Sequence, residues 1–263
     1  MLEILAIIAT FIFGTIIGSF LNCFVYRLKE NQEFIKGRSH CPKCQHQLSW
    51  LDLLPVVSFL FLGGKCRYCH QKIAWQYLIV ELVTGVLFGL VFIYELQAKN
   101  FGVLNLDSVA SLGFLTLILS FLIIIFIYDL KYYLIPDQII YSAIIATLLF
   151  KIFFGWSWLI LLAVLVAGGF FFLIWLVSKG AWMGFGDVKL AIFMGLFLGW
   201  PLILVALFLA FFIGAIIGLI LMLLKQKGIK SEIPFGPFLI IATCLAFVWG
   251  NELISWYLNL IYY

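Results

Sequence analysis

Charged residues are scarce in this sequence. Aspartate, glutamate, lysine and arginine make up 11% of its 263 residues, whereas hydrophobic residues make up 65%. That share of charge is about half of what soluble domains carry. The mean hydropathy is +1.19, and apolar runs of about 20 residues, each long enough to cross a bilayer, recur along the chain. The shortage of charge therefore excludes a soluble globular protein and predicts a polytopic membrane protein.

Three further features are missing. The sequence has no internal repeat, no low-complexity tract and no glycine motif of the dinucleotide-binding type. Residues 1–26 lack the basic start and the small-residue cleavage site of a signal peptide. We therefore interpret them as a first transmembrane helix that is retained in the mature protein.

The apolar runs predict an all-α polytopic membrane protein with about eight transmembrane helices. They lie at residues 2–26, 76–96, 109–128, 137–153, 157–178, 187–199, 201–224 and 236–260. The run 187–199 is shorter than a bilayer is thick and is followed by Pro201, which favours a half-span or a broken helix. One long polar segment, residues 27–74, follows the first helix, and we call it the cysteine loop.

The basic residues predict which side of the membrane the cysteine loop faces. The loop holds eight of the 16 lysines and arginines, and alternation through the spans adds six more on the same side. These six are Lys131, Lys179, Lys189, Lys225, Lys227 and Lys230, whereas only Lys99 and Lys151 fall on the other side. Because basic residues concentrate on the cytoplasmic side, the loop is expected there and both termini outside. The net charge of +4 then reflects loops facing anionic lipid, and no nucleic acid is implied.

Four of the six cysteines form two Cys-x-x-Cys pairs in the loop. Cys41 and Cys44 lie in "HCPKCQH", and Cys66 and Cys69 lie in "KCRYCH". Two such pairs are typical of a closed structural zinc site, and the reducing cytoplasm disfavours the alternative of two disulfides. A loop this short has too little core to fold alone, so a metal ion would organise it.

The remaining metal-binding side chains have simpler interpretations. The three histidines, His40, His46 and His70, adjoin the cysteine pairs and could each replace a thiolate, but with four cysteines present we expect them at the surface. Cys23 and Cys244 lie within apolar runs and are expected to be small packing residues.

Four acidic residues lie within or at the rim of the spans: Glu81, Asp129, Asp137 and Asp187. Ionisable groups there are costly and are functional candidates by default. Asp129 and Asp187 both fall at the cytoplasmic ends of their runs, so they can lie at one depth and face each other. Two close carboxylates tend to share a proton, which allows one to activate water while the other protonates a scissile bond. The pair thus predicts an aspartic protease site.

The surroundings of the two aspartates differ. Asp129 lies at a helix C-terminus, where the dipole disfavours negative charge, so we expect it to hold the shared proton and Asp187 to be ionised. Gly184 and Gly186 lack side chains, which would let an extended peptide approach Asp187.

Each of these groups also has a structural alternative. Asp137 follows Pro136 where a helix begins, so capping is the favoured interpretation there, and Asp187 could cap its helix in the same way. Lys189 could hold charge at the site or simply lie along the membrane interface. A proton-coupled transporter could use Asp129, Asp187 and Glu81 as a relay, but it would be expected to show two related halves, and the sequence has none.

On these residues the chain resembles the type IV prepilin peptidase family of membrane aspartic proteases. The family's Gly-x-Gly-Asp motif is similar to "GFGDVK", which supplies Gly184, Gly186, Asp187 and Lys189, and its first aspartate context is similar to "YDLKYYLIPD", which supplies Asp129. "GSFLNCFVYRL" near the N-terminus, the cysteine loop and "IPFGPFL" at 233–239 also match family signatures, so the resemblance covers nearly the whole chain.

The resemblance implies a bacterial inner-membrane enzyme with its active site on the cytoplasmic side. Its substrate would be a type IV prepilin or pseudopilin, cut after the leader's last glycine, and the new N-terminus would be methylated from S-adenosylmethionine. Gly64 and Glu81 match positions associated with methylation. The implied organisation is a first helix at 1–26, a methylation-associated loop at 27–74 and a protease domain at 75–263. A presenilin-like protease is the alternative, but the cysteine loop and the missing Pro-Ala-Leu motif argue against it.

Overall fold

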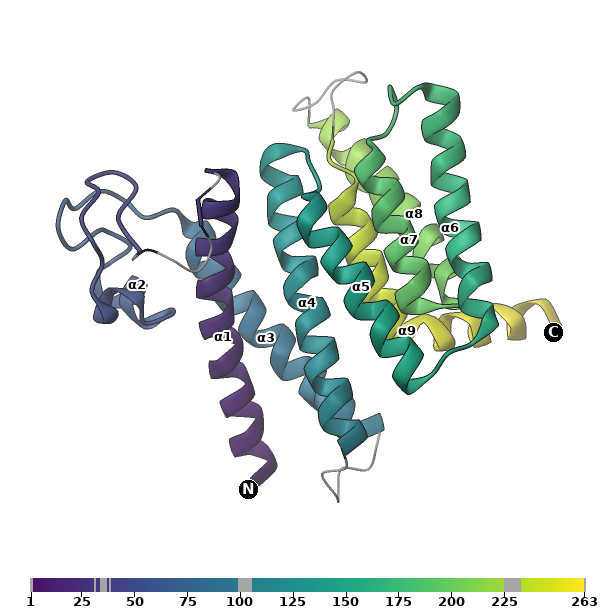
Figure 1. The fold of residues 1–263 in the computed structure, drawn as a ribbon, viewed down its shortest axis with the longest axis horizontal. Helices are drawn as coiled ribbons and strands as arrows, with labels where there is room; N and C mark the ends of the chain where they lie inside the picture. Colours follow the sequence, from purple (N-terminus) through teal and green to yellow (C-terminus); the bar gives the residue numbers. More distant parts are fainter. Residues whose placement is uncertain are drawn as a thin grey trace. The chain divides into compact units, whose positions relative to one another are not determined.

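Long helices form where the apolar runs lie in the sequence. The computed structural model describes residues 2–30, 32–33, 37, 39–98, 106–224 and 233–262. The helices are α1 (Leu2–Lys29), η1 (Trp50–Leu53), α2 (Val57–Phe61), α3 (Trp75–Ala98), α4 (Leu106–Tyr132), α5 (Asp137–Phe154), α6 (Trp158–Ser178), α7 (Phe185–Leu198), α8 (Leu202–Leu223) and α9 (Gly236–Tyr262) (Figure 1). Beside them, the described residues contain only two isolated β-bridges, both in the cysteine loop.

The all-α membrane fold expected from the sequence is confirmed. Seven of the helices, α1, α3, α4, α5, α6, α8 and α9, are long and apolar enough to cross a membrane. The short run forms α7, which has 14 residues and is not among the seven. At a rise of about 1.5 Å per residue, α7 is about 21 Å long, less than the roughly 30 Å of a hydrocarbon core.

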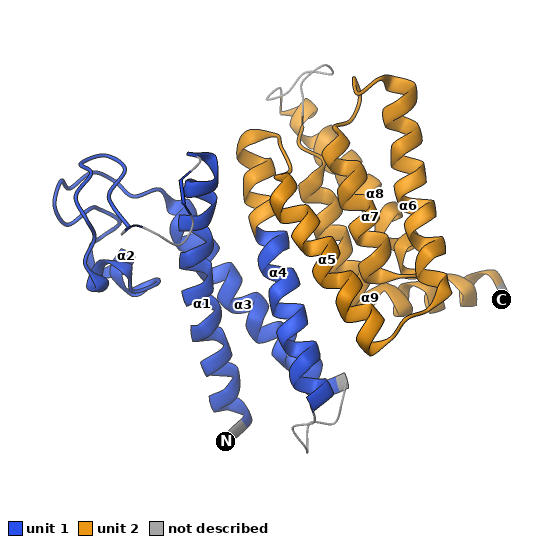
Figure 2. Cartoon of the chain, viewed as in Figure 1, with its two compact units in different colours: residues 1–123 blue, residues 124–263 orange. Residues whose placement is uncertain are grey.

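The chain divides into two compact units, residues 1–123 and 124–263 (Figure 2). Unit 1 contains α1, the cysteine loop, α3 and the first part of α4. Unit 2 contains the rest of α4 and the helices α5 to α9.

Close packing of α1 on α3 builds unit 1. A Cβ atom added to Gly14 would lie 2.8 Å from the Cα of Gly85, and one added to Gly18 would lie 2.8 Å from the Cα of Glu81. The spacing Gly14-x-x-x-Gly18 is the small-residue pattern that lets membrane helices approach closely. It brings backbone against backbone and places Glu81 in the helix interface.

Helix α7 forms the centre of unit 2. It packs on α5, α6, α8 and α9, and its buried residues are Val188, Leu190, Ala191, Phe193, Met194, Gly195, Leu196, Phe197 and Leu198. A helix that is apolar all round is expected to be enclosed by other helices. Because protein surrounds α7, its short length needs no compensation by lipid.

Several basic residues used to predict the orientation lie outside the described residues. They are Lys36, Arg38, Lys99, Lys225, Lys227 and Lys230. Of the described ones in unit 2, Lys131 lies in the last turn of α4, Lys179 follows α6 and Lys189 lies near the start of α7. Lys151 lies in the last turn of α5.

Candidate active site

Asp187 lies in the first turn of α7. Gly184 is the N-cap residue, and the backbone N–H of Asp187 donates to the Gly184 carbonyl at 3.2 Å. The Asp187 carboxylate in turn accepts a hydrogen bond from the Gly184 N–H. The carboxylate thus makes the half of a capping box that the third helical residue supplies, while Gly184 has no side chain to make the other half. The helix N-terminus favours a negative charge there. The capping interpretation of Asp187 therefore holds locally, and it fixes the carboxylate in one place.

Asp129 lies near the end of α4 and is buried, with 5% of its surface exposed. The chain leaves the helix at Tyr133, whose φ of 56° is left-handed. The Asp129 carboxyl group accepts a hydrogen bond from the N–H of Gly236, the first residue of α9. Its Oδ2 atom is buried and has no hydrogen-bond partner among the described residues.

Both aspartates are thus held at helix N-termini. Asp129 ends one helix but faces the free N–H groups at the start of another, so the α9 dipole offsets the α4 dipole. The expectation that the dipole singles out Asp129 as the proton carrier considered only its own helix, and the contact with Gly236 removes that basis. The remaining difference between the two aspartates is Asp129 Oδ2, which is buried and has no partner among the described residues.

The connection between α4 and α5 brings these groups together. A Cβ atom on Gly186 would lie 3.0 Å from the Cβ of Ile135, and one on Gly236 would lie 3.5 Å from the Ile135 Cδ1. Ile135 therefore contacts the starts of both α7 and α9. The charge of Asp129 acts on the Asp187 carboxyl group, so the two expected acidic residues share one site in unit 2.

The two motif glycines have different surroundings. Gly186 needs to lack a side chain because Ile135 of the same chain fills that space. A Cβ on Gly184 would meet nothing closer than the Gly186 nitrogen at 3.9 Å, an ordinary van der Waals contact, so no side chain fills that space. Of the two, only Gly184 offers room for the close approach of a peptide.

Lys189 binds Asp137 rather than the paired aspartates. Its Nζ lies 2.6 Å from Asp137 Oδ1, and it also lies over the rings of Tyr141 and Phe185, at 5.0 and 5.3 Å from their centroids. The Lys189 side chain is 12% exposed and that of Asp137 63%. The ion pair thus ties the first turn of α5 to the first turn of α7. Asp137, expected to be a helix cap, is the first residue of α5 and also half of this link.

The four loop cysteines converge on one point in unit 1. Their sulfur atoms all lie within 4.8 Å of one another, and Cys41 and Cys69 Sγ are 3.9 Å apart. A tetrahedral zinc ion with bonds of about 2.3 Å separates its sulfur ligands by about 3.8 Å. A disulfide would require about 2.05 Å, and all four are free thiols. The donor set therefore fits a closed four-thiolate metal site.

The two cysteine pairs have the same local geometry. In each, the first cysteine donates its N–H to a carbonyl five residues later, as from Cys41 to His46 and from Cys66 to Gln71. In each, the residue before that carbonyl, Gln45 or His70, has a left-handed φ of 58° or 56°. The repeated turn points both pairs of thiols inward, as zinc knuckles require.

The surroundings of Cys41 favour its thiolate form. Burial raises the pKa of the Cys41 thiol, but hydrogen bonds from the backbone N–H groups of Cys44 and Lys43 outweigh burial and lower the pKa to about 7. Outside the cluster, Asp52 accepts hydrogen bonds from Arg67 Nε at 2.7 Å and from the Tyr68 hydroxyl at 3.2 Å. Burial raises the pKa of Asp52, but the Ser49 and Arg67 contacts lower it overall. Asp52 thereby links η1 to the second knuckle, a role that its sequence position did not reveal.

The two methylation-associated positions also lie in unit 1. Glu81 is buried in α3 and accepts a hydrogen bond from the Val56 N–H at 2.7 Å and another from the Ser19 side chain. Asn22 of α1 donates from Nδ2 to the carbonyl of Tyr77, one turn before Glu81 in α3. The Oδ1 atom of Asn22 is buried and has no partner among the described residues. Gly64 has a left-handed φ of 67°, and a Cβ there would lie 3.1 Å from the Phe59 ring.

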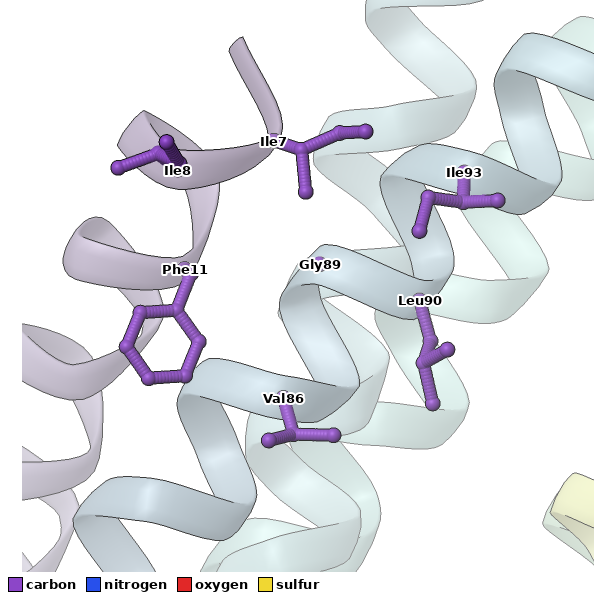
Figure 3. Close-up of a pocket in the computed structure, with 7 residues that line it drawn as sticks. All are labelled: Ile7, Ile8, Phe11, Val86, Gly89, Leu90 and Ile93. Carbon is purple, nitrogen blue, oxygen red and sulfur yellow. The ribbon is translucent and has the colours of Figure 1, made fainter. Parts of the chain in front are cut away.

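A hollow between α1 and α3 is unsuited to chemistry. It is lined by Ile7, Ile8, Phe11, Val86, Gly89, Leu90 and Ile93, all apolar (Figure 3). No ionisable or hydrogen-bonding side chain faces it, so it is a packing defect or a lipid contact rather than a candidate active site.

Family models match both units. The bacterial peptidase A24 N-terminal domain matches residues 12–95, which include the four loop cysteines, Gly64 and Glu81. The type IV leader peptidase family matches residues 116–219, which include Asp129 and Asp187. Gly236 lies beyond both matches; the only sequence signal for it was the motif "IPFGPFL".

Several curated proteins are similar over nearly the whole chain. A Bacillus subtilis protein is 33% identical, with 95% of this chain and 97% of its own length aligned. An Aeromonas hydrophila protein is 31% identical, with 95% and 92% aligned, and a Pseudomonas aeruginosa protein is 30% identical, with 96% and 93% aligned. Each carries the name prepilin leader peptidase/N-methyltransferase. No solved structure matches the chain significantly.

Proposed function

This chain belongs to the type IV leader peptidase family, and from that premise we propose that it cuts prepilin leader peptides with Asp129 and Asp187. The observation that carries the proposal is the meeting of these two carboxyl groups in unit 2. They come from runs far apart in the sequence, and the charge of one acts on the other. Two such carboxyl groups divide acid and base roles between them.

The reaction is the hydrolysis of one peptide bond. The ionised carboxylate takes a proton from a water molecule as the water oxygen attacks the scissile carbonyl carbon. The protonated carboxyl gives its proton to the carbonyl oxygen. When the C–N bond breaks, the carboxyl that took the proton from water gives it to the departing amine, and the hydroxyl proton of the tetrahedral intermediate returns to the other carboxylate. Asp129 Oδ2, buried and without a described partner, is suited to carry the shared proton. Asp187, whose carboxylate accepts the Gly184 N–H at the start of α7, is suited to be the base.

The location of the pair suits a substrate that is itself partly in the membrane. Asp129 lies close to the end of the spanning helix α4, and Asp187 opens α7. A prepilin, with a short basic leader followed by an apolar helix, would present its cut site at such a boundary. No side chain crowds Gly184, which would let an extended strand approach the carboxylates. We propose that this end, together with the cysteine loop, faces the cytoplasm, as the basic residues predict.

The cysteine loop is proposed to hold structural zinc. Cys41, Cys44, Cys66 and Cys69 supply four thiolates at the separation that tetrahedral zinc requires. With all four positions taken by protein, the ion has no open site for substrate. Zinc would therefore keep the two knuckles folded without entering the reaction.

The second activity, N-methylation, is proposed for unit 1. S-adenosylmethionine would supply the methyl group. Glu81 is a buried carboxylate, and Asn22 Oδ1 beside it is an acceptor without a described partner. Two acceptors suit the α-ammonium group of a newly cut chain, which must lose a proton before it can accept a methyl group. Gly64 would act indirectly, by shaping the turn beneath Phe59.

Mass spectrometry of a co-expressed prepilin tests the proposal. Uncut, cut, and cut-and-methylated forms differ in mass. We expect Asp129→Asn and Asp187→Asn each to leave the prepilin uncut while the protein remains in the membrane. Glu252→Gln, which changes an exposed carboxylate in α9, is the matched control and should cut normally. Cleavage that survives either aspartate change would remove the aspartic mechanism and leave the capping and transporter interpretations to be reconsidered.

A further inference from the structure

Residues 54–62 of the cysteine loop, which we call the α2 segment, expose apolar side chains. Phe61 is 88% exposed and Leu60 65%, and Leu54 and Val57 are exposed as well. A soluble loop rarely presents such a continuous apolar surface to water. Trp50 in the neighbouring η1 and Trp75 at the start of α3 are also exposed, at 72% and 69%. The segment therefore needs an apolar environment on its outer side.

The depth of Glu81 in the bilayer follows from the length of α3. The helix has 24 residues and is about 36 Å long, about 6 Å more than a hydrocarbon core of about 30 Å. Glu81 lies six residues beyond Trp75, or about 9 Å into the helix. If all of the roughly 6 Å by which α3 exceeds the hydrocarbon core projected on the loop side, the Cα of Glu81, about 9 Å from the start of α3, would still lie about 3 Å inside the hydrocarbon. Tilting α3 shortens, along the membrane normal, both the helix and the distance from its start to Glu81, so Glu81 stays inside the hydrocarbon.

Two contacts bring the α2 segment to that depth. The Val56 N–H donates to Glu81 Oε2 at 2.7 Å, and the Phe59 ring lies 5.4 Å from the Trp75 ring, centroid to centroid. The start of α2 is therefore attached to the side of α3, deeper in the bilayer than Trp75, at which α3 begins. Figure 1 shows α2 level with the second half of α1 and not beyond its end.

The backbone at this attachment is held in an uncommon conformation. Val56 has a φ of 62°, a left-handed value that β-branched residues rarely adopt. Such conformations persist where surrounding contacts impose them. Here Glu81 binds the N–H of that residue, and the Ser19 hydroxyl binds Glu81. The buried carboxylate of Glu81 therefore holds the turn at Val56 and anchors the α2 segment to α3.

The charge of the surrounding loop fits a lipid surface. Residues 39–74 carry four basic side chains, Lys43, Lys65, Arg67 and Lys72, and one acidic side chain, Asp52. All four basic residues are exposed, and Asp52 already binds Arg67. Exposed basic groups beside an apolar segment match the anionic headgroups and acyl chains of a bilayer.

We propose that the α2 segment inserts into the cytoplasmic leaflet of the bilayer, anchored by Glu81, so that the cysteine knuckles lie on the membrane surface. The apolar surface of Leu60 and Phe61 is then continuous with the lipid-facing surface of unit 1. The cysteine loop, expected from the sequence only to face the cytoplasm, is then a membrane-inserted module.

Photolabelling of the wild-type protein in vesicles tests the insertion directly. The vesicles contain phosphatidylethanolamine, phosphatidylglycerol and a phospholipid with a diazirine at the end of one acyl chain. After illumination, peptide mapping locates the lipid adducts. We expect adducts on residues 54–62 and on the exposed face of α8 near Phe208, and none on residues 42–48. Adducts on α8 without any on 54–62 would overturn the proposal, as would equal labelling of 42–48 and 54–62.

A substitution provides an independent measurement. Phe61→Asp places a charge at the most exposed apolar position of the segment and should lower its labelling several-fold while zinc content and cleavage are kept. Gln47→Asp, at an exposed polar position in the same loop, is the control and should leave labelling of 54–62 unchanged. Unchanged labelling in the Phe61→Asp protein would show that the segment does not insert through this side chain and would overturn the proposal.

Discussion

Gly236 donates its backbone N–H to the carboxyl group of Asp129 and lies so close to it that a Cβ atom would be 2.5 Å from Oδ2. Gly236→Ala must therefore displace the carboxyl group or the start of α9. Displacing a reacting group by about 1 Å can cost about 100-fold in rate. We expect kcat for prepilin cleavage to fall between about tenfold and 100-fold, with KM little changed.

The control for this change is Gly218→Ala. Gly218 lies in α8 with open space where a Cβ would be added, so cleavage kinetics should equal those of the wild type. Equal kinetics for Gly236→Ala as well would show that the close approach does not position Asp129.

The ion pair between Lys189 and Asp137 should support the site without taking part in the reaction. We expect Lys189→Met and Asp137→Asn each to lower kcat/KM several-fold, far less than the loss from Asp129→Asn. Because both single changes break the same link, the double variant should be no worse than the poorer single one. The coupling free energy for such a partly exposed pair is expected to be about 0.5–1 kcal/mol. A strictly additive double variant would argue that the two residues act separately.

Zinc removal should separate the two activities. The four thiolates lie in unit 1 and the two aspartates in unit 2. We expect Cys41→Ser, or treatment with a strong chelator, to unfold the knuckles and abolish methylation while cleavage persists. Metal analysis should find one zinc ion per chain in the wild type and in Cys244→Ser, whose thiol is remote in sequence and lies in α9. Loss of cleavage together with zinc would contradict this division.

The adjacent glycines of the loop offer a matched comparison. Gly63 and Gly64 both have left-handed φ values, 58° and 67°, but only at Gly64 would a Cβ meet a neighbour, the Phe59 ring at 3.1 Å. Alanine at either position should cost about 1–2 kcal/mol of backbone strain, and at Gly64 the clash should add about 1 kcal/mol. Chelator-driven zinc release should therefore be several-fold faster from Gly64→Ala than from Gly63→Ala. Equal rates would show that Phe59 moves aside freely.

The sequence was sufficient to single out the candidate groups that the structure brings together, because each is of an unusual type for its position. Carboxylates at the rim of apolar runs are energetically costly, which singled out Asp129 and Asp187. The Cys-x-x-Cys spacing singled out the four cysteines whose sulfur atoms converge. The shortness of α7 was also predictable from the apolar run and Pro201. These features depend on local composition, which a sequence displays directly.

Features that depend on contacts between distant residues could not be found in this way. The dipole argument for Asp129 considered α4 alone and could not include the N–H of Gly236 in α9, which binds the carboxyl group. The α2 segment was not recognised from the sequence because the charged residues around it make residues 27–74 polar as a whole. Its attachment to Glu81 depends on the close approach of α1 and α3, and hence on small residues such as Gly18.

The enclosure of α7 has a consequence for how the enzyme responds to its membrane. A helix exposed to lipid shifts or tilts when bilayer thickness changes, because its apolar length must match the hydrocarbon. Helix α7 is bounded by other helices on nearly every side, so the height of Asp187 is set by protein packing. The position of the cut should then stay constant when growth temperature or lipid composition alters bilayer thickness, because helix packing and not the lipid sets the height of the catalytic carboxylate.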